Sequence, residues 1–141
     1  MAAVLKTIVP SLGVSLPCNA HRVPNQSLVA SEALAAGDSC YINADGTVYR
    51  TNGTAAAPAA LSDGIVLLDV ALGGPVTLFT AIECSYGPAS LAPGTRLYVD
   101  TVLGGLNTAP TVGGTIPVAK VVYVNITSST PHAVIRFNAN R

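Results

Sequence analysis

The sequence predicts an all-β fold: a compact antiparallel β-barrel or sandwich of about eight short strands, preceded by an extended N-terminal arm. Short apolar runs are separated by turn signals roughly every ten residues. Several of these runs alternate apolar and polar residues, which is typical of half-buried strands. No stretch repeats apolar residues at helical spacing over the length of a helix, so we expect no long helix.

One pattern occurs twice and organises the rest of the chain. Residues 34–42 read LAAGDSCYI and residues 91–99 read LAPGTRLYV. Both copies contain Leu-Ala-x-Gly, two variable residues, a small or apolar residue, Tyr and a β-branched residue. Alternation places the tyrosine of each copy on the outer face and its two neighbours toward the core. The pattern therefore predicts two similar corners of one β-domain and carries no chemistry of its own.

Three glycines mark the turns on which this fold depends. We expect Gly37 and Gly94 where the chain turns sharply into the strand of each copy. Gly46 belongs to an Asp-Gly turn between the predicted strands 39–43 and 47–50, which is a strong hairpin signal. Valine in place of Gly37 or Gly94 is therefore expected to impair folding itself.

Further strands follow from the remaining apolar runs. They are 65–70, 76–80 with 82–86 as its extension or a strand of its own, 116–127 and 133–137. Pro117 should lie at the start of its strand or at a sheet edge, since it cannot donate to a ladder. Lys120 falls within an apolar run and is expected to point outward or to mark a break in the alternation. Asp69 interrupts another run and, if buried, needs a partner such as an arginine.

The N-terminal segment has a different character from the rest of the chain. Prolines recur there at Pro10, Pro17 and Pro24, which forbids a long helix and favours extended chain. We therefore divide the sequence into an arm, residues 1–30, and a β-domain, residues 31–141. The alternative is that this segment supplies an ordinary first strand of the domain.

The composition points to contacts with other protein chains. The 141 residues carry no formal net charge, so there is no electrostatic case for nucleic acid or for an anionic membrane surface as a partner. Only 10% of the residues are charged, against about a quarter in ordinary soluble domains. Mean hydropathy is +0.51. We expect an oligomer or an assembly component; the alternative is a monomer whose surface is rich in Ser, Thr, Asn, Gly and Ala.

Residues able to perform chemistry are few and scattered. Cys18, Cys40 and Cys84 lack metal-ligand spacing and are expected to be free thiols made in a reducing compartment. His21 and His132 are expected at the surface or an interface. The sequence contains no nucleophile elbow, phosphate-binding loop or dense carboxylate cluster. We therefore predict no catalytic residues, no metal, no cofactor and no enzymatic activity.

The order of these parts carries a family resemblance. The segments concerned are 35–38 leading into 41–42, then 45–49, 63–65, 74–78, 93–95, 97–99 and 104–106. Their order and spacing, from Leu34 to Phe137, resemble the capsid decoration, or cement, proteins of tailed bacteriophages. The individual motifs are turn and strand motifs of modest specificity, so the resemblance depends on their sequence along the chain.

The resemblance implies a role on the virion. Such proteins are small and β-rich, are made in the host cytoplasm, bind the major capsid protein on the outside of the expanded head, and often form trimers. A terminal arm commonly reaches neighbouring capsid subunits, and here it could add a strand to a capsid sheet edge. The expected contact residues in this arm are Lys6, Thr7, Ile8, Val9, Pro10, Ser11 and Leu12. The Gly- and Ala-rich loops are the other expected interaction surface.

A different class of function is a β-barrel adhesin or a fibre-type binding module that recognises a host surface ligand. Such a module needs a concave site with polar and aromatic groups. The chain has no Trp, five Tyr and two Phe, which argues against this alternative. A small enzyme is a more distant third possibility.

Overall fold

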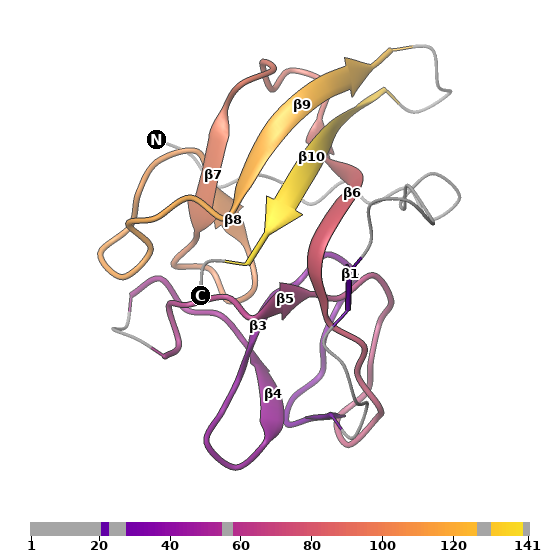
Figure 1. The fold of residues 1–141 in the computed structure, drawn as a ribbon, viewed down its shortest axis with the longest axis vertical. Helices are drawn as coiled ribbons and strands as arrows, with labels where there is room; N and C mark the ends of the chain where they lie inside the picture. Colours follow the sequence, from indigo (N-terminus) through magenta and orange to yellow (C-terminus); the bar gives the residue numbers. More distant parts are fainter. Residues whose placement is uncertain (1–20, 23–27, 55–57, 127–130, 140–141) are drawn as a thin grey trace.

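The computed structural model describes residues 21–22, 28–54, 58–126 and 131–139 (Figure 1). This part of the chain contains strands and turns but no helix. The strands are β1 (His21–Arg22), β2 (Val29–Ala30), β3 (Ser39–Ile42), β4 (Thr47–Arg50), β5 (Gly64–Ile65), β6 (Phe79–Pro88), β7 (Arg96–Val99), β8 (Leu106–Asn107), β9 (Ala119–Asn125) and β10 (His132–Asn138). The predicted all-β class is confirmed.

The strands form one sheet with the order β2-β4-β3-β5-β6-β10-β9-β7-β8, and β1 pairs with β6. Every pairing is antiparallel except that of β2 with β4. The two ends of this path, β2 and β8, do not pair in the described chain, so the sheet is not closed into a barrel. Figure 1 shows β7, β9, β10 and β6 side by side above the hairpin of β3 and β4.

Four strands lie where the sequence predicts them. The segments 39–43, 47–50, 97–99 and 133–137 are confirmed as β3, β4, β7 and β10. Four of the ten strands, β1, β2, β5 and β8, are only two residues long. An alternating pattern needs more residues than that to be recognised, and these short strands bring the total to ten where about eight are expected.

Three predicted strand boundaries are wrong. The apolar run 65–70 is a strand only at Gly64–Ile65, and the chain then leaves the ladder until Val70 makes an isolated bridge to Leu34. Residues 76–78 are not in a strand, whereas 79–88 form one continuous strand. The long run 116–127 begins its strand at Ala119, two residues after Pro117. In each case single residues outside the strand still donate backbone hydrogen bonds to other segments, Val66 to Asp38, Val76 to Leu28 and Val118 to Leu97, but these do not extend the strand.

Asp69 has a different environment from the one expected for a buried acid. Its side chain is exposed, and its Oδ1 accepts a hydrogen bond of 2.8 Å from the backbone N–H of Ala36. Among the residues that the structure describes, no arginine side chain bonds to it. The carboxylate thus fixes the turn of the first repeated pattern against the loop that follows β5.

The predicted boundary between arm and domain also moves. The described part of the segment 1–30 belongs to the sheet, because β1 pairs with β6 and β2 pairs with β4. Ala30 is buried in the core, and its N–H donates to the carbonyl of Gly74 at 3.0 Å. The domain therefore begins before residue 31. Residues 1–20, with the predicted contact segment Lys6–Leu12, lie outside the described residues.

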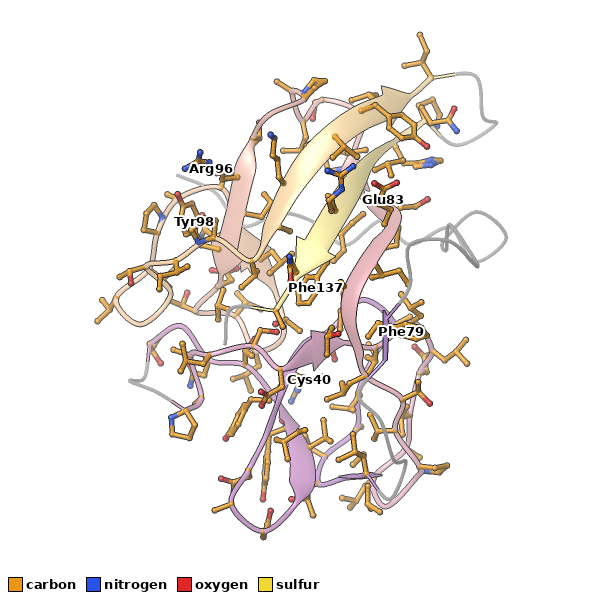
Figure 2. All side chains as sticks on the ribbon, in the orientation of Figure 1. Cys40, Phe79, Glu83, Arg96, Tyr98 and Phe137 are labelled. Atoms are coloured by element: carbon orange, nitrogen blue, oxygen red, sulfur yellow. The ribbon has the colours of Figure 1, made fainter. Side chains whose placement is uncertain are left out.

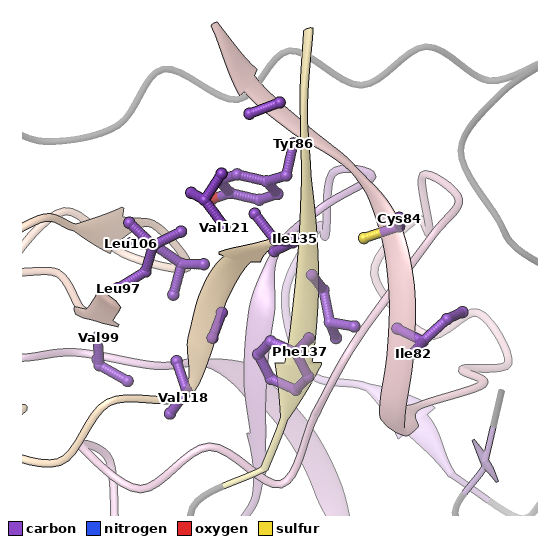
Figure 3. Packing of buried hydrophobic residues seen from close by; sticks show 13 residues of the cluster. Ile82, Cys84, Tyr86, Leu97, Val99, Leu106, Val118, Val121, Ile135 and Phe137 are labelled. Atoms are coloured by element: carbon purple, nitrogen blue, oxygen red, sulfur yellow. The ribbon is translucent and has the colours of Figure 1, made fainter. Parts of the chain in front are cut away.

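Two clusters of buried apolar side chains form the core. The large cluster lies under β6 to β10 (Figure 3) and comprises Ile65, Ile82, Cys84, Tyr86, Leu97, Val99, Leu106, Val118, Ala119, Val121, Ala133, Ile135 and Phe137. The small cluster lies at the first hairpin and comprises Ala30, Leu34, Cys40, Val48, Val66, Val76 and Leu78. Cys40 and Leu97 occupy the same slot of the repeated pattern and lie in different clusters, so each copy of the pattern supports its own core.

The two copies of the pattern also share their hydrogen bonds. In the first, the N–H of Gly37 donates to the carbonyl of Val66 and the N–H of Val66 donates to that of Asp38. In the second, the same two bonds join Gly94 to Val121 and Val121 to Thr95. Both glycines have positive φ, 89° and 91°. Residues 34–66 and 91–121 are thus two examples of one unit: a glycine turn, a strand, a hairpin and a returning segment.

The two units are locked together through glycine backbone. The N–H of Gly104, in the hairpin of the second unit, donates to the carbonyl of Thr51, and its carbonyl accepts from the N–H of Ser39, both at 2.9 Å. The N–H of Gly53 donates to the carbonyl of Asp100 at 2.8 Å. Side chains at these positions would hold the two backbones apart, which explains why glycine is needed where the units meet.

The first testable consequence concerns Gly53. In Gly53→Ala the new Cβ would lie 2.7 Å from the carbonyl oxygen of Val99 and 2.8 Å from that of Asp100. These are backbone atoms that cannot move alone, so we expect the free energy of unfolding to fall by about 2–3 kcal/mol in urea titrations.

Gly46→Ala is the matched control for this substitution. Gly46 has φ +83° but open space around its missing Cβ, so only the backbone strain of about 1 kcal/mol is expected. Equal losses in the two variants would contradict the proposed role of the contact between the units.

Candidate functional site

Three loops that are distant in the sequence meet on one side of the molecule (Figure 1). They are residues 52–54, 101–105 and 111–114, which we call the three-loop surface. Gly53 is their common point, because its N–H donates to Asp100 and its carbonyl accepts from the N–H of Gly113 at 2.7 Å. The contact between the two units therefore also assembles this surface.

The three-loop surface is apolar and carries no charge. Val102, Leu103 and Val112 expose 61%, 40% and 87% of their area. The remaining residues of these loops are Thr, Asn and Gly, so no ionisable side chain lies in them. Exposed apolar side chains that gather in an uncharged setting are a feature of protein–protein contact sites.

Hydrogen bonds hold the loops of this surface in one conformation. Thr111 donates from Oγ1 to the carbonyl of Val99 at 2.7 Å, and this Oγ1 accepts from the N–H of Gly114 at 2.9 Å. The buried Asp100 accepts at Oδ1 from the backbone N–H of Thr101 at 2.7 Å and from Nδ2 of Asn107 at 3.0 Å. A surface that is ordered before binding loses less conformational entropy when a partner covers it.

Two buried polar groups lie near this surface. Oδ2 of Asp100 and the hydroxyl of Tyr86 have no hydrogen-bond partner among the described residues, but both side chains are closed off from solvent. Burial raises the pKa of Tyr86 well above its usual value, and the neighbouring Leu106 backbone offsets this only partly. A substrate cannot reach either group, so we assign them to the core.

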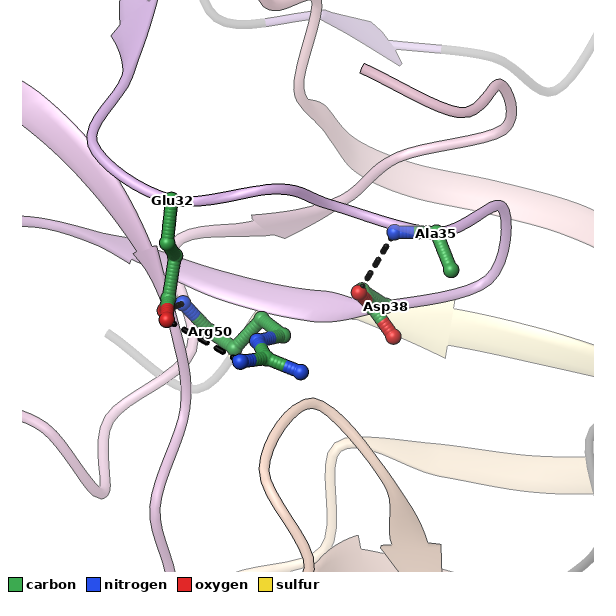
Figure 4. A network of polar contacts seen from close by, with 4 residues as sticks. All are labelled: Glu32, Ala35, Asp38 and Arg50. Carbon is green, nitrogen blue, oxygen red and sulfur yellow. Dashed lines mark hydrogen bonds and ion pairs between the residues drawn. The ribbon is translucent and has the colours of Figure 1, made fainter. Parts of the chain in front are cut away.

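A second polar network lies beside the first hairpin (Figure 4). Glu32 accepts at Oε1 from Nη2 of Arg50 at 3.0 Å and at Oε2 from the backbone N–H of Arg50 at 2.8 Å. Partial burial pushes the pKa of Glu32 upward, but the hydrogen bonds and charge of Arg50 outweigh this and lower it. Asp38 is buried and accepts at Oδ2 from the N–H of Ala35 at 2.7 Å. These contacts fix the turn at residues 34–38 to the hairpin.

The remaining cysteines and the histidine whose side chains the structure describes are buried. Cys40 and Cys84 are buried thiols, and burial raises the pKa of Cys84 to about 12. Cys18 and the side chain of His21 lie outside the described part of the chain. His132 was expected at a surface or interface but is buried at the start of β10, where it lies opposite Asn125 and Pro88.

The described residues contain neither a cluster of metal ligands nor a membrane-spanning helix. Among the described residues, no three His, Cys, Asp or Glu side chains lie close enough to hold a metal ion. No helix in this part of the chain is long and apolar enough to cross a membrane.

The predicted site residues divide into two groups. The contact segment Lys6–Leu12 is outside the described residues, so its role stays a prediction. Gly37, Gly46 and Gly94 all have positive φ, 89°, 83° and 91°, as their predicted turns require. The Gly-rich loops were expected to be an interaction surface, but the sequence did not indicate which of them would meet.

A scan against protein-family models found no matching family, and a search of curated proteins found no relative.

The ion pair of Glu32 and Arg50 has a testable pH dependence. Because the pKa of Glu32 is lower in the folded protein, its stabilising contribution is fully present above the usual pKa of a glutamate and is lost as the pH falls below that value and through the lowered pKa of the folded state. We expect the stability difference between wild type and Glu32→Gln to shrink from pH 7 to pH 3, by less than about 1 kcal/mol because the pair is partly exposed. Urea midpoints at the two pH values measure this.

A double-mutant cycle supplies the control. In an Arg50→Gln background, Glu32→Gln should show no such pH-dependent difference. A difference that persists in this background would assign the effect to a group other than Arg50.

Proposed function

We propose that this protein is a structural component of a tailed-phage virion, one that binds the outer surface of the capsid and stabilises the expanded head. The three-loop surface is the observation that carries the proposal, because it is apolar, uncharged and ordered in advance. The order of turn and strand motifs that resembles capsid decoration proteins supports the same role. The major capsid protein is the proposed partner.

The size of the surface suits a contact that is repeated many times. Burying apolar area contributes about 25 cal/mol per Å², so three side chains such as Val102, Leu103 and Val112 give a modest gain in each copy. An oligomer, with a trimer favoured, would multiply these contacts on a symmetric lattice and raise the avidity without strong single contacts.

The arm has a separate part in the proposal. Residues 6–12 would add a strand to an exposed edge of a capsid sheet, where backbone hydrogen bonds need no particular side chains. This contact is independent of the three-loop surface, so the two can be removed one at a time.

The experiment measures binding of purified protein to expanded and unexpanded heads of the parent phage. We expect saturable binding to expanded heads only, with binding weakened at least about tenfold by Val112→Asp and by deletion of residues 1–12, since an interface charge or a lost strand each costs more than about 1.4 kcal/mol. Sedimentation of the free protein should show a stable oligomer.

Leu72→Asp is the matched control, because Leu72 is 70% exposed and lies in the loop whose Gly73 N–H donates to Ala30, away from the three-loop surface. It should bind heads as wild type does. A monomeric protein that ignores expanded heads would overturn the proposal, and full binding by the truncated protein would remove the arm from it.

One observation favours recognition of a host surface ligand instead. Tyr41 and Tyr49 are cross-strand partners on the outer face of the first hairpin, with ring centroids 5.7 Å apart and planes inclined by 21°. Stacked tyrosines stabilise a sheet by themselves. A glycan array separates the two roles: binding that Tyr41→Ala abolishes would support the ligand-recognition function, and its absence is expected here.

A further inference from the structure

Three cations stand side by side on one exposed face of the sheet. In the register of β7, β9 and β10, Arg96 lies opposite Lys120, and Lys120 lies opposite Arg136. The next strand places Glu83 opposite Arg136. All three cations are exposed. Figure 2 labels Arg96 and Glu83, which stand at the two ends of this line of four charged residues. We call Arg96, Lys120 and Arg136 the cationic row.

Only one end of the cationic row is neutralised. Arg136 donates from Nε and Nη2 to Oε2 of Glu83, at 2.9 and 2.7 Å. Arg96 and Lys120 make no ion pair with an acid of the described chain. Three of the seven Lys and Arg residues of a chain without net charge are thus gathered in one line.

Such an arrangement is unfavourable for the isolated protein. Neighbouring strands are about 4.8 Å apart, and like charges placed directly opposite one another destabilise a sheet. The fold does not require them, because the core side chains of these strands point to the other face. The row therefore has the character of a site that a ligand of opposite charge completes.

Tyrosines border the cationic row on the same face. Tyr98 follows Arg96 by two residues on β7. Tyr123 on β9 lies opposite Val134, and Val134 precedes Arg136 by two residues on β10. Tyr123 is 52% exposed. Aromatic rings beside guanidinium groups supply the apolar area that an ion pair alone lacks, and Tyr and Arg are the residues enriched in protein interfaces.

We propose that the cationic row binds an acidic segment of another protein, with carboxylates seated on Arg96 and Lys120. A guanidinium donates two parallel hydrogen bonds to a carboxylate, and the lysine adds a mobile point charge beside it. The face uses residues outside the three-loop surface, so this inference does not depend on the capsid role.

The charge of the face favours carboxylates over nucleic acid. Binding driven by phosphates needs many neutralised charges, whereas this row has three cations and ends in an acid. A continuous phosphate backbone that crossed the strands would meet Glu83. A short acidic peptide can place its side chains on Arg96 and Lys120 and stop there.

The test uses the full chain labelled with ¹⁵N and titrated in low salt with an octamer of glutamate. We expect the signals of Arg96, Lys120 and Arg136 to shift together, and Lys120→Gln to weaken binding about threefold. Arg50→Gln is the matched control, because it removes the same charge from β4 in the first hairpin, where Arg50 pairs with Glu32 and is not part of the cationic row, and it should leave binding unchanged.

Each other result overturns the proposal. Shifts that map elsewhere, or equal weakening by Lys120→Gln and Arg50→Gln, would show that the row is not the site. An octamer of lysine that binds as well as the glutamate octamer would rule out charge recognition. Tighter binding of a twelve-nucleotide oligo-dT at the same residues would make the row a nucleic-acid contact. Head binding in the same variants reports on the capsid role separately.

Discussion

The fold depends on close backbone contact between its two repeated units. Gly104 of the second hairpin donates to Thr51 and accepts from Ser39, and Gly53 joins the first unit to Asp100. Backbones can approach this closely only where side chains are missing. The same contacts place residues 52–54, 101–105 and 111–114 beside one another, so one constraint joins the two core clusters and also creates the surface to which we assign binding.

The sequence predicts the features that depend on local periodicity and misses those that depend on contacts between distant segments. Alternation identified β3, β4, β7 and β10, and the repeated pattern identified the turns at Gly37 and Gly94, because these depend on residues close together in the chain. The two-residue strands could not be found, since tertiary contacts define them. The run 65–70 misled for the same reason: after Ile65 only Val66 and Val70 make backbone hydrogen bonds to the first repeated pattern, and Leu68 is exposed.

The candidate surfaces could be anticipated only in part. Gly-rich loops were expected to carry contacts, but their meeting at Gly53 follows from the register of the two units. The cationic row was less accessible still, because Arg96, Lys120 and Arg136 are far apart in the sequence and become neighbours only when β7, β9 and β10 pair. The low proportion of charged residues in the whole chain gave no indication that three cations lie next to one another in the sheet.

The duplicated architecture has a consequence for the order of folding. The bonds from Thr51 and Ser39 to Gly104 close loops of more than fifty residues, and β6 joins β5 of one unit to β10 at the end of the chain. Contacts between distant residues slow folding, because chain entropy is lost before they form. During synthesis, the glycine backbone of the first unit therefore stays exposed to solvent until the second hairpin has emerged from the ribosome.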